Sequence, residues 1–169
     1  MKRHAAVLLI LFALSGEALA TSVCRAGEEA YFRCSFSGKI AVLCGATDRA
    51  TGGKLLQYRI TKGRRTEMQF PNSPEAPDSR FLQSSILLAH GGEMRVSFSV
   101  GEYKYVLYET WDTRSPSYGG IYVVRKGKLV RQNQCDDYTD PQASLFESRI
   151  NKLLKQEDFV DFSVPKNDG

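Results

Sequence analysis

The sequence predicts a mainly β protein, an antiparallel β barrel or sandwich of about seven to nine strands with one C-terminal amphipathic helix. Apolar and polar residues alternate in short runs, and turn residues separate those runs. Apolar residues recur at helical spacing after Asp140. Because side chains alternate across a strand but recur every three to four residues on a helix face, the two patterns distinguish the two kinds of element.

The chain begins with the features of a secretory signal peptide. Lys2 and Arg3 precede an apolar run at 5–14, and Ala18-Leu19-Ala20 has the small-x-small pattern of a cleavage site. We therefore expect residues 1–20 to be removed after Ala20 and the mature chain to be periplasmic. The apolar run is shorter than the roughly 20 residues of a membrane span, so we expect no membrane span.

Size and charge limit the classes of function. Without residues 1–20 the chain has 149 residues, enough for one domain with a hydrophobic core. Loss of Lys2, Arg3 and Glu17 lowers the formal net charge from +4 to +3. Such a mild excess of positive charge does not indicate a nucleic-acid binder, which would carry a concentrated basic face.

The four cysteines predict two disulfides. Cys24, Cys34, Cys44 and Cys135 all follow the leader, and an even number in an exported chain favours paired sulfurs. Their wide spacing lacks the close pair typical of a zinc site, and His90 is the single histidine after the leader. We expect no metal and no cofactor, and three disulfide connectivities are possible.

The first hairpin turns at Ser37-Gly38, between two alternating runs. A two-residue loop there places Cys34 and Cys44 on opposite faces of the sheet, because strand side chains alternate. A direct bond between these two cysteines is therefore awkward, and Cys24 or Cys135 must reach the hairpin. The N-terminal segment and the last strand would then both be tied to it.

Further strand candidates follow in order. Residues 55–61 turn back at Lys62-Gly63-Arg64 into a second hairpin. Residues 71–80 contain three prolines, so we expect a surface loop. Residues 81–90 are the next strand, which turns at Gly91-Gly92.

The central hairpin is rich in aromatic residues and turns at Gly101-Glu102. Glycine takes positive φ without a steric penalty, which suits the first position of a two-residue turn. In that register one face is apolar, and we expect it to lie in the core. Its cross-strand pairs are Val100 with Tyr103, Phe98 with Tyr105, and Val96 with Leu107.

Two residues of this hairpin depart from the pattern. Tyr108 falls on the polar face, which makes it a candidate for ligand contact. Glu109 falls on the apolar face between Leu107 and Trp111. We expect Glu109 to turn toward solvent as a strand-end residue, because burial of a lone carboxylate is costly.

Residues 112–120 contain proline and glycine and predict a loop, after which a last hairpin turns at Lys126-Gly127. The β domain would thus span 21–140. A helix is expected over 141–156, with Asp140 as N-cap and proline at its first position. Residues 157–169 form a tail. The apolar side of the helix would present Leu145, Phe146, Ile150, Leu153 and Leu154.

The sequence favours no enzyme. A Ser-His-Asp site would need His90 as its base, yet His90 has the context of an ordinary strand-end residue beside a Gly-Gly turn. The acids Asp136, Asp137 and Asp140 lack the glycine turn and distal glutamate of a calcium loop. A glycosidase needs two facing carboxylates. No spacing selects a pair from Glu93, Glu102, Glu109 and Asp112.

The predicted loop after the aromatic strand is the first candidate binding surface. It mixes tyrosine with serine and glycine, as loops that recognise proteins commonly do. A plain connection between strands is the alternative. The candidate binding residues are Arg114, Ser115, Ser117 and Tyr118, together with Tyr108.

Two basic hairpin tips are the second candidate surface. If they lie at the same end of the sheet, they would attract phosphate, lipopolysaccharide or an acidic protein. Charged tips also protect strand edges from pairing with other chains, which is the alternative role. The residues are Lys62, Arg64 and Arg65 in one tip, and Arg125, Lys126 and Lys128 in the other.

The hairpin "CSFSGKIAVLC", the strand "GEYKYVLYETW" and the closing "GKLVRQNQC" resemble a group of small exported bacterial β proteins over roughly residues 31–137. In general shape these are similar to periplasmic lysozyme inhibitors, which close an enzyme's active-site cleft with a loop. One inhibitor class carries a Ser-Gly-x-x-Tyr element. Here Ser37-Gly38 is followed by Lys39-Ile40-Ala41, so the resemblance assigns no inhibitory residue.

We therefore expect a periplasmic binding protein that acts as an inhibitor or immunity-type factor against a cell-wall hydrolase or toxin. It would use surface loops, bind a protein partner and need no nucleic acid. The alternative is a binder of anionic envelope components through the basic hairpin tips. The sequence leaves the oligomeric state open.

Overall fold

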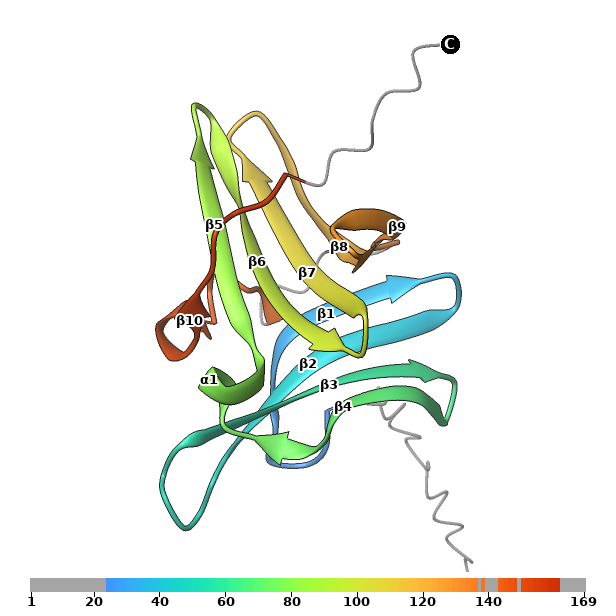
Figure 1. The fold of residues 1–169 in the computed structure, drawn as a ribbon, viewed down its shortest axis with the longest axis vertical. Coiled ribbons are helices and arrows are strands. Elements are labelled where there is room, and N and C mark those ends of the chain that lie inside the picture. The colour runs from blue at the N-terminus through green and yellow to red at the C-terminus, as the bar shows by residue number, and fades with distance from the viewer. Residues whose placement is uncertain (1–23, 137, 139–142, 149, 162–169) are drawn as a thin grey trace, which may run out of the picture.

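Two β-sheets make up the fold in the computed structural model of the chain (Figure 1). The structure describes residues 24–136, 138, 143–148 and 150–161. The first sheet has four strands, in the order β1 (Glu29–Phe36), β2 (Lys39–Thr47), β3 (Lys54–Lys62) and β4 (Arg65–Glu75). The second has six, in the order β10 (Lys155–Gln156), β5 (Leu82–Leu88), β6 (Gly91–Val100), β7 (Tyr103–Asp112), β8 (Ser115–Arg125) and β9 (Lys128–Gln134).

The prediction of a mainly antiparallel β fold is confirmed, with ten strands in the described part of the chain against the seven to nine expected. Every pair of neighbouring strands is antiparallel except β10 and β5, which pair over two residues in parallel. The sheets remain separate and do not close into a barrel. The predicted signal peptide, residues 1–20, lies outside the described residues.

Both disulfides form, and both reach the first hairpin as predicted. Cys24 bonds to Cys44, and Cys34 bonds to Cys135. Cys34 is buried between the sheets, whereas Cys44 packs with Val42 in a separate small cluster. The side chains of Cys34 and Cys44 therefore lie on opposite faces of the four-stranded sheet, because side chains alternate along a strand.

The core lies between the two sheets, and the aromatic hairpin supplies its centre. Phe98 stacks on Phe70 at 4.7 Å and on Tyr105 at 5.2 Å, measured between ring centroids. The predicted register of β6 and β7 is confirmed at every pair, and Val96, Phe98 and Leu107 are buried. Tyr105 is half-buried, and Val100 and Tyr103, each 39% exposed, flank the turn at the end of the hairpin.

The prediction of a surface loop at 71–80 is wrong. Strand β4 continues through Glu75, Pro71 is buried, and the short helix α1 (Pro77–Arg80) follows. Strand β4 is the edge of its sheet. Proline lacks a backbone donor and is tolerated in a sheet mainly at such an edge.

The prediction of a loop at 112–120 is also wrong, because β7 and β8 form a hairpin with only Thr113 and Arg114 between them. The glycines allow close packing within a strand. A Cβ at Gly119 would lie 2.5 Å from the ring of Tyr138, and a Cβ at Gly120 would lie 2.4 Å from the hydroxyl of Tyr108.

The expected helix over 141–156 is not supported. Its described residues form a turn at 145–148, the short 3-10 helix η2 (Ile150–Leu153) and strand β10. Asp140 and Pro141 lie outside the described residues. The apolar residues of this segment enter the core from a turn, from η2 and from the residue after it, and those in the core are Leu145, Ile150 and Leu154.

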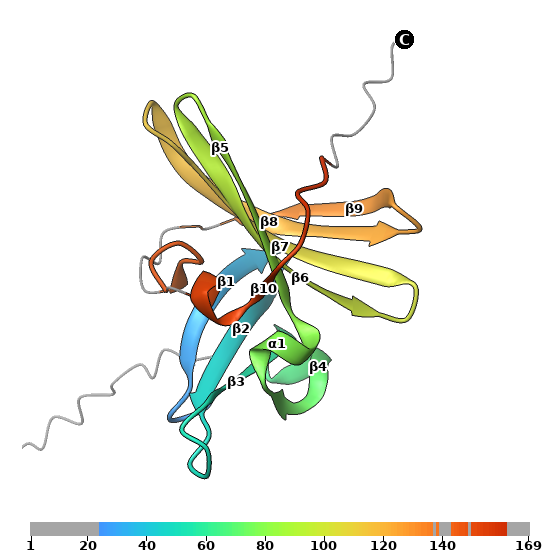
Figure 2. The same ribbon diagram turned by 60° about the vertical axis from the view of Figure 1, so that its left-hand side comes forward.

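Residues 157–161, here called the strap, continue from β10 across the outer face of the six-stranded sheet (Figure 2). The Glu157 carboxylate accepts hydrogen bonds from the Ser97 hydroxyl and the Lys104 ammonium, both at 2.5 Å. Arg95 donates to the backbone oxygen of Val160. These polar bonds attach the strap to β6 and β7.

Among the described residues, no helix has the length and apolar character needed to cross a membrane.

Candidate functional site

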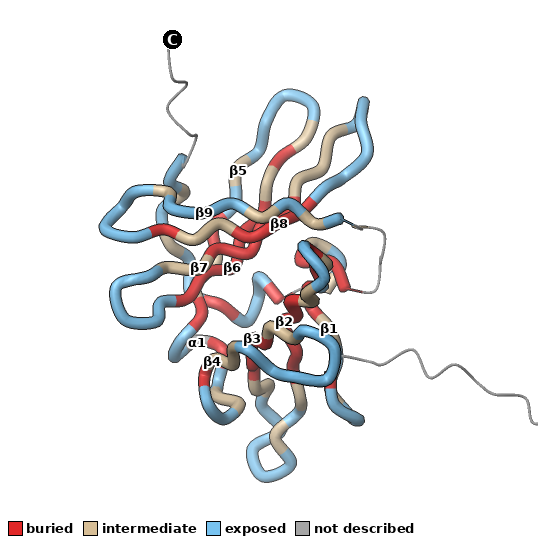
Figure 3. Tube along the Cα trace, turned by 90° about the vertical axis from the view of Figure 1, so that its right-hand side faces the viewer, coloured by how far each residue is buried: buried red, intermediate tan, exposed pale blue. Residues whose placement is uncertain are grey.

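Two hairpins, β5–β6 and β7–β8, project side by side beyond the four-stranded sheet (Figure 1). Their ends are joined by a hydrogen bond of 2.8 Å from the Thr113 N–H to the His90 backbone oxygen. We call these two ends, residues 86–92 and 112–118, the paired tips. Both are largely exposed at their extremities (Figure 3).

The paired tips expose two adjacent leucines. Leu87 is 82% exposed and Leu88 is 62% exposed. Neighbouring residues of a strand point to opposite faces, so the β5–β6 hairpin carries an apolar side chain on both faces. Isolated exposed apolar residues are common, but large apolar groups at a projecting tip are typical of a contact surface.

A hollow of about 410 Å³ lies beside the paired tips on the outer face of the six-stranded sheet. Its volume falls within the roughly 300–1,000 Å³ of clefts that hold small ligands. The strap contributes to its lining. The residues around it are Ile86, Leu88, Gly92, Glu93, Arg95, Thr110, Trp111, Asp112, Ser115, Pro116, Tyr118, Phe159 and Asp161.

The structure brings two of the predicted binding residues into this hollow. Ser115 and Tyr118 line it, and Tyr118 is 47% exposed. Arg114 lies at the tip of the hairpin, and Ser117 is exposed on β8. The predicted binding residues thus lie on one hairpin, but only Ser115 and Tyr118 among them line the hollow.

The predicted contact residue Tyr108 is fully buried. Its ring stacks on that of Tyr122 at 4.2 Å and meets the ring of Tyr118 edge-on at 6.4 Å. Burial raises the pKa of the Tyr108 phenol. Tyr108 therefore supports Tyr118 from beneath, and solvent does not reach it.

Charges around the hollow are mainly acidic. Its lining has the carboxylates of Glu93, Asp112 and Asp161 and the guanidinium of Arg95. Arg95 is buried, donates to Glu93, and lies 3.9 Å from the centre of the Phe159 ring. A hydrogen bond from the Arg114 backbone N–H holds the pKa of Asp112 below its usual value.

The two basic tips differ in their surroundings. At the β8–β9 tip, Arg125 donates to Glu102 at 2.8 Å, and the Lys126 ammonium lies 3.6 Å from the same carboxylate group. Lys128 is exposed beside them. At the β3–β4 tip the cations Lys62, Arg64 and Arg65 are all exposed.

Two of the candidate catalytic or calcium-binding residues, Glu109 and Asp136, form hydrogen bonds within the fold. The prediction that Glu109 turns toward solvent is wrong, because it is 5% exposed and accepts hydrogen bonds from the Ser144 hydroxyl at 2.8 Å and the Leu145 N–H at 2.6 Å. His90 is exposed at a turn. Asp136 accepts a bond from the Ser37 N–H at 3.1 Å, and Asp137 and Asp140 lie outside the described residues.

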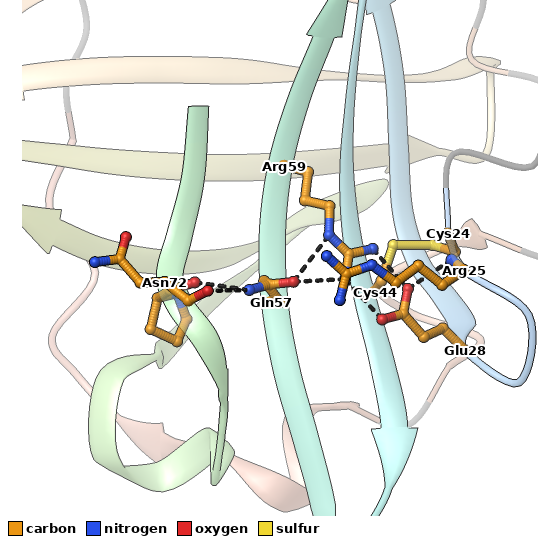
Figure 4. A network of polar contacts seen from close by, with 8 residues as sticks. Cys24, Arg25, Glu28, Cys44, Gln57, Arg59 and Asn72 are labelled. Carbon is orange, nitrogen blue, oxygen red and sulfur yellow. Dashed lines mark hydrogen bonds and ion pairs between the residues drawn. A yellow bond between two sulfur atoms is a disulfide. The ribbon is translucent and has the colours of Figure 1, made fainter. Parts of the chain in front are cut away.

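A buried polar network lies on the outer face of the four-stranded sheet (Figure 4). Arg59 donates to both oxygens of Glu28, each at 2.6 Å, and to the side-chain oxygen of Gln57. The side-chain amide of Gln57 donates to the Pro71 backbone oxygen at 2.8 Å. Its members bond to one another, so we assign the network a structural role.

One set of possible metal ligands occurs in the described part of the chain: Cys24, Glu28 and Cys44. The two sulfurs are bonded to each other, and the carboxylate is held by Arg59. A disulfide sulfur is a poor metal ligand, since metals bind the thiolate. This cluster is therefore not a candidate metal site.

Sequence reasoning missed Leu87 and Leu88. The run Ile86-Leu87-Leu88 carried the relevant pattern, because three successive apolar residues in a strand cannot all face one core. Which face would be exposed depends on where the four-stranded sheet ends, and local sequence does not contain that information.

No protein-family model, curated protein or solved structure matches the chain. The paired tips and the hollow beside them are the features from which a function can be inferred.

Proposed function

We propose that the chain is an exported binding protein that inhibits or neutralises a cell-wall hydrolase or toxin by inserting its paired tips into that partner. The observation that carries the proposal is the exposure of Leu87 and Leu88 at the end of a projecting hairpin. In protein complexes a few side chains that become fully desolvated at the centre of the contact contribute most of the binding free energy.

The rigidity of the tips supports this proposal. The strands of both hairpins belong to one continuous sheet, and the Thr113–His90 bond ties their ends together. A preorganised surface loses less conformational entropy on binding than a mobile loop does. Paired hairpins are thus well suited to entering a cleft.

Local charge also supports a protein partner with basic groups at its contact surface. The chain as a whole is positively charged, which would repel a basic enzyme at long range. The lining of the hollow, however, has three carboxylates and one buried guanidinium, and Arg114 beside it pairs with Asp112 at 3.4 Å, which leaves the acids in excess by one. A lysine or arginine of the partner would find complementary charge there, next to Tyr118.

Export is part of the proposal. The N-terminal pattern is typical of a cleaved leader, and disulfides persist mainly in oxidising compartments such as the periplasm. The two disulfides of the chain agree with such a location.

The experiment is capture followed by enzymology. The tagged chain is recovered from the envelope fraction, co-purifying hydrolases or toxins are identified, and the activity of each is measured with and without the chain. We expect one of them to be inhibited. The double variant Leu87→Asp/Leu88→Asp should bind at least about 100-fold more weakly, whereas the matched change Val130→Asp, at an exposed valine of β9, should have little effect. Equal inhibition by both variants would exclude the paired tips.

A second candidate function is binding to anionic envelope components. The observation favouring it is the exposure of Lys62, Arg64 and Arg65 at the β3–β4 tip. The β8–β9 tip contributes less, because Glu102 neutralises part of its charge. Binding of the chain to a polyanionic glycan that falls steeply as the salt concentration rises would favour this function over the first. The Leu87→Asp/Leu88→Asp variant should then bind the glycan as well as the wild type does.

A further inference from the structure

A second opening lies between the two sheets, away from the paired tips. It has a volume of about 240 Å³ and opens to solvent. Both sheets contribute to it through their core-facing side chains. We call it the inter-sheet groove, and its lining is Phe36, Lys39, Ile60, Met68, Tyr103, Tyr105, Ile121, Val123, Arg131 and Asn133.

The walls of the inter-sheet groove are apolar and incompletely covered. Ile60, Met68, Tyr105 and Val123 face inward, yet each is only half-buried. The sheets diverge here, so that part of the core surface stays in contact with water. Covering such a surface is favourable by about 25 cal/mol per Å² of apolar area.

Cations surround one side of the opening. Arg131 is exposed, and its Nε donates to the side-chain oxygen of Asn133 at 3.2 Å. The Lys39 ammonium lies 2.5 Å from Glu67, whose pKa this hydrogen bond lowers. Lys62 and Arg65 also act on that carboxylate. The lining of the groove itself thus has two cations, Lys39 and Arg131, and no carboxylate.

We propose that the inter-sheet groove binds a linear carboxylate with a single apolar chain, that is, a medium-chain fatty acid. The chain would lie against Ile60, Met68 and Val123, and the carboxylate would meet Arg131. The groove is smaller than the roughly 300–1,000 Å³ clefts that take drug-sized ligands. Its volume therefore suits a ligand smaller than drug-sized molecules.

The proposal predicts a dependence of affinity on chain length. Each buried methylene contributes about fourfold to the binding constant. Affinity should therefore rise by up to that factor per methylene from octanoate to dodecanoate and then level off once the groove is filled. A site that recognises charge alone would show no such rise.

The test is an NMR titration of the isotopically labelled chain with dodecanoate below its micelle concentration. We expect saturable amide shifts confined to Ile60, Met68, Val123 and their neighbours. Val123→Trp fills the groove and should abolish them. Val130→Trp, the matched change on the neighbouring strand, should leave them unchanged, and the dispersion of each spectrum reports whether the variant folds.

The contribution of charge to binding can still be tested if Val123→Trp fails to fold. Arg131→Glu should weaken dodecanoate binding about tenfold, and Arg114→Glu, at the distant β7–β8 tip, should not change it. Dodecyltrimethylammonium should bind at least about tenfold more weakly than dodecanoate. Equal binding of the two amphiphiles, an unchanged affinity in Arg131→Glu, or no saturable binding at all would overturn the proposal. The leucine variant of the paired tips should bind dodecanoate like the wild type, which separates this site from the proposed partner surface.

Discussion

Arg59 is a charged residue in the interior of the molecule, and its environment explains how the fold tolerates it. Its side chain is 4% exposed and that of Glu28 is 8% exposed. An isolated buried charge is very costly, but a bidentate bond to a carboxylate offsets much of that cost. The segment that carries Glu28 is held over the sheet by the Cys24–Cys44 bond. The disulfide and the ion pair thus act on the same segment.

The pair should make stability depend on pH. The hydrogen bond from Arg59 lowers the pKa of Glu28 from its unfolded value of about 4.5. A lowered folded-state pKa stabilises the fold above the unfolded value and ceases to do so as the pH falls through the folded value. We expect Glu28→Gln to cost about 3 kcal/mol at pH 7, because Arg59 loses its counter-charge, and distinctly less at pH 3.

Urea unfolding at the two pH values measures both quantities. Glu102→Gln is the matched control, since Glu102 also pairs with an arginine but is largely exposed. It should cost less than about 1 kcal/mol. A cost for Glu28→Gln that is the same at pH 7 and pH 3 would contradict this account.

Glu109 is another buried charged residue, and it organises the segment that follows β9. Its carboxylate accepts a hydrogen bond from the Leu145 backbone N–H at 2.6 Å, so this N–H is paired although the segment is not an α-helix. We expect Glu109→Ala to cost about 3 kcal/mol by leaving buried donors unpaired, and Glu147→Ala, an exposed residue of the same segment, to cost little.

The fluorescence of Trp111 gives a local readout for this variant. Trp111 is the only tryptophan and its ring lies 4.2 Å from that of Phe146, next to the bonded backbone. Its emission should shift to longer wavelength in Glu109→Ala as the segment loosens. Unchanged emission together with unchanged stability would show that Glu109 has no such role.

Residue positions were predictable where they depend on local turns. The Gly101-Glu102 turn fixed each pair of β6 and β7 correctly. Tyr108 and Glu109 were wrongly predicted as accessible, because what covers them comes from β8 and from residues 143–148, far along the chain. Local pattern identifies the face of a strand but not the segment that covers it.

At the scale of elements, hairpins such as β1–β2 and β6–β7 were predicted well, whereas the β7–β8 hairpin and the segments after β4 and β9 were not. A hairpin needs a turn with the right backbone preferences and two alternating runs, all of which are adjacent in sequence. The glycines at 119–120 were predicted to lie in a loop. They lie in β8, where the absence of a side chain leaves room for the rings of Tyr108 and Tyr138. The helical spacing after Asp140 arose from side chains that enter the core from a turn, from η2 and from the residue after it.

The strap is attached to the sheet in part through the charge of Glu157. Glu157→Gln should weaken its bonds to Ser97 and Lys104, whereas Asp158→Asn changes an exposed neighbour. The Glu157 N–H donates to the Gln83 oxygen at 2.8 Å, so its hydrogen exchange reports release of the strap. We expect exchange about threefold to tenfold faster in Glu157→Gln. Equal exchange in the two variants would show that the carboxylate does not hold the strap.

At the scale of the whole molecule, the Cys34–Cys135 bond joins β1 of the four-stranded sheet to the residue that follows β9 of the six-stranded sheet. It spans 101 residues, and the Cys24–Cys44 bond spans 20. Loss of chain entropy in the unfolded state grows with the length of the closed loop. We expect Cys34→Ala/Cys135→Ala to cost about 4 to 5 kcal/mol and Cys24→Ala/Cys44→Ala about 3. Thermal and urea unfolding of the two variants measure the difference, and a larger loss from the shorter loop would contradict this order.

The two sheets differ in extent, and that difference produces the surfaces to which we assign functions. Where the six-stranded sheet extends past its partner, the paired tips expose Leu87 and Leu88. Where the sheets diverge, the inter-sheet groove exposes part of the core. The sequence predicts the strands, but the relative extent of the sheets follows from their packing.

The most direct test of the central claim is hydrogen–deuterium exchange of the chain with and without the partner it captures. We predict protection at residues 86–92 and 112–118 on both paired tips and none at the β3–β4 tip. Protection centred on Lys62, Arg64 and Arg65, with the paired tips unchanged, would contradict the account.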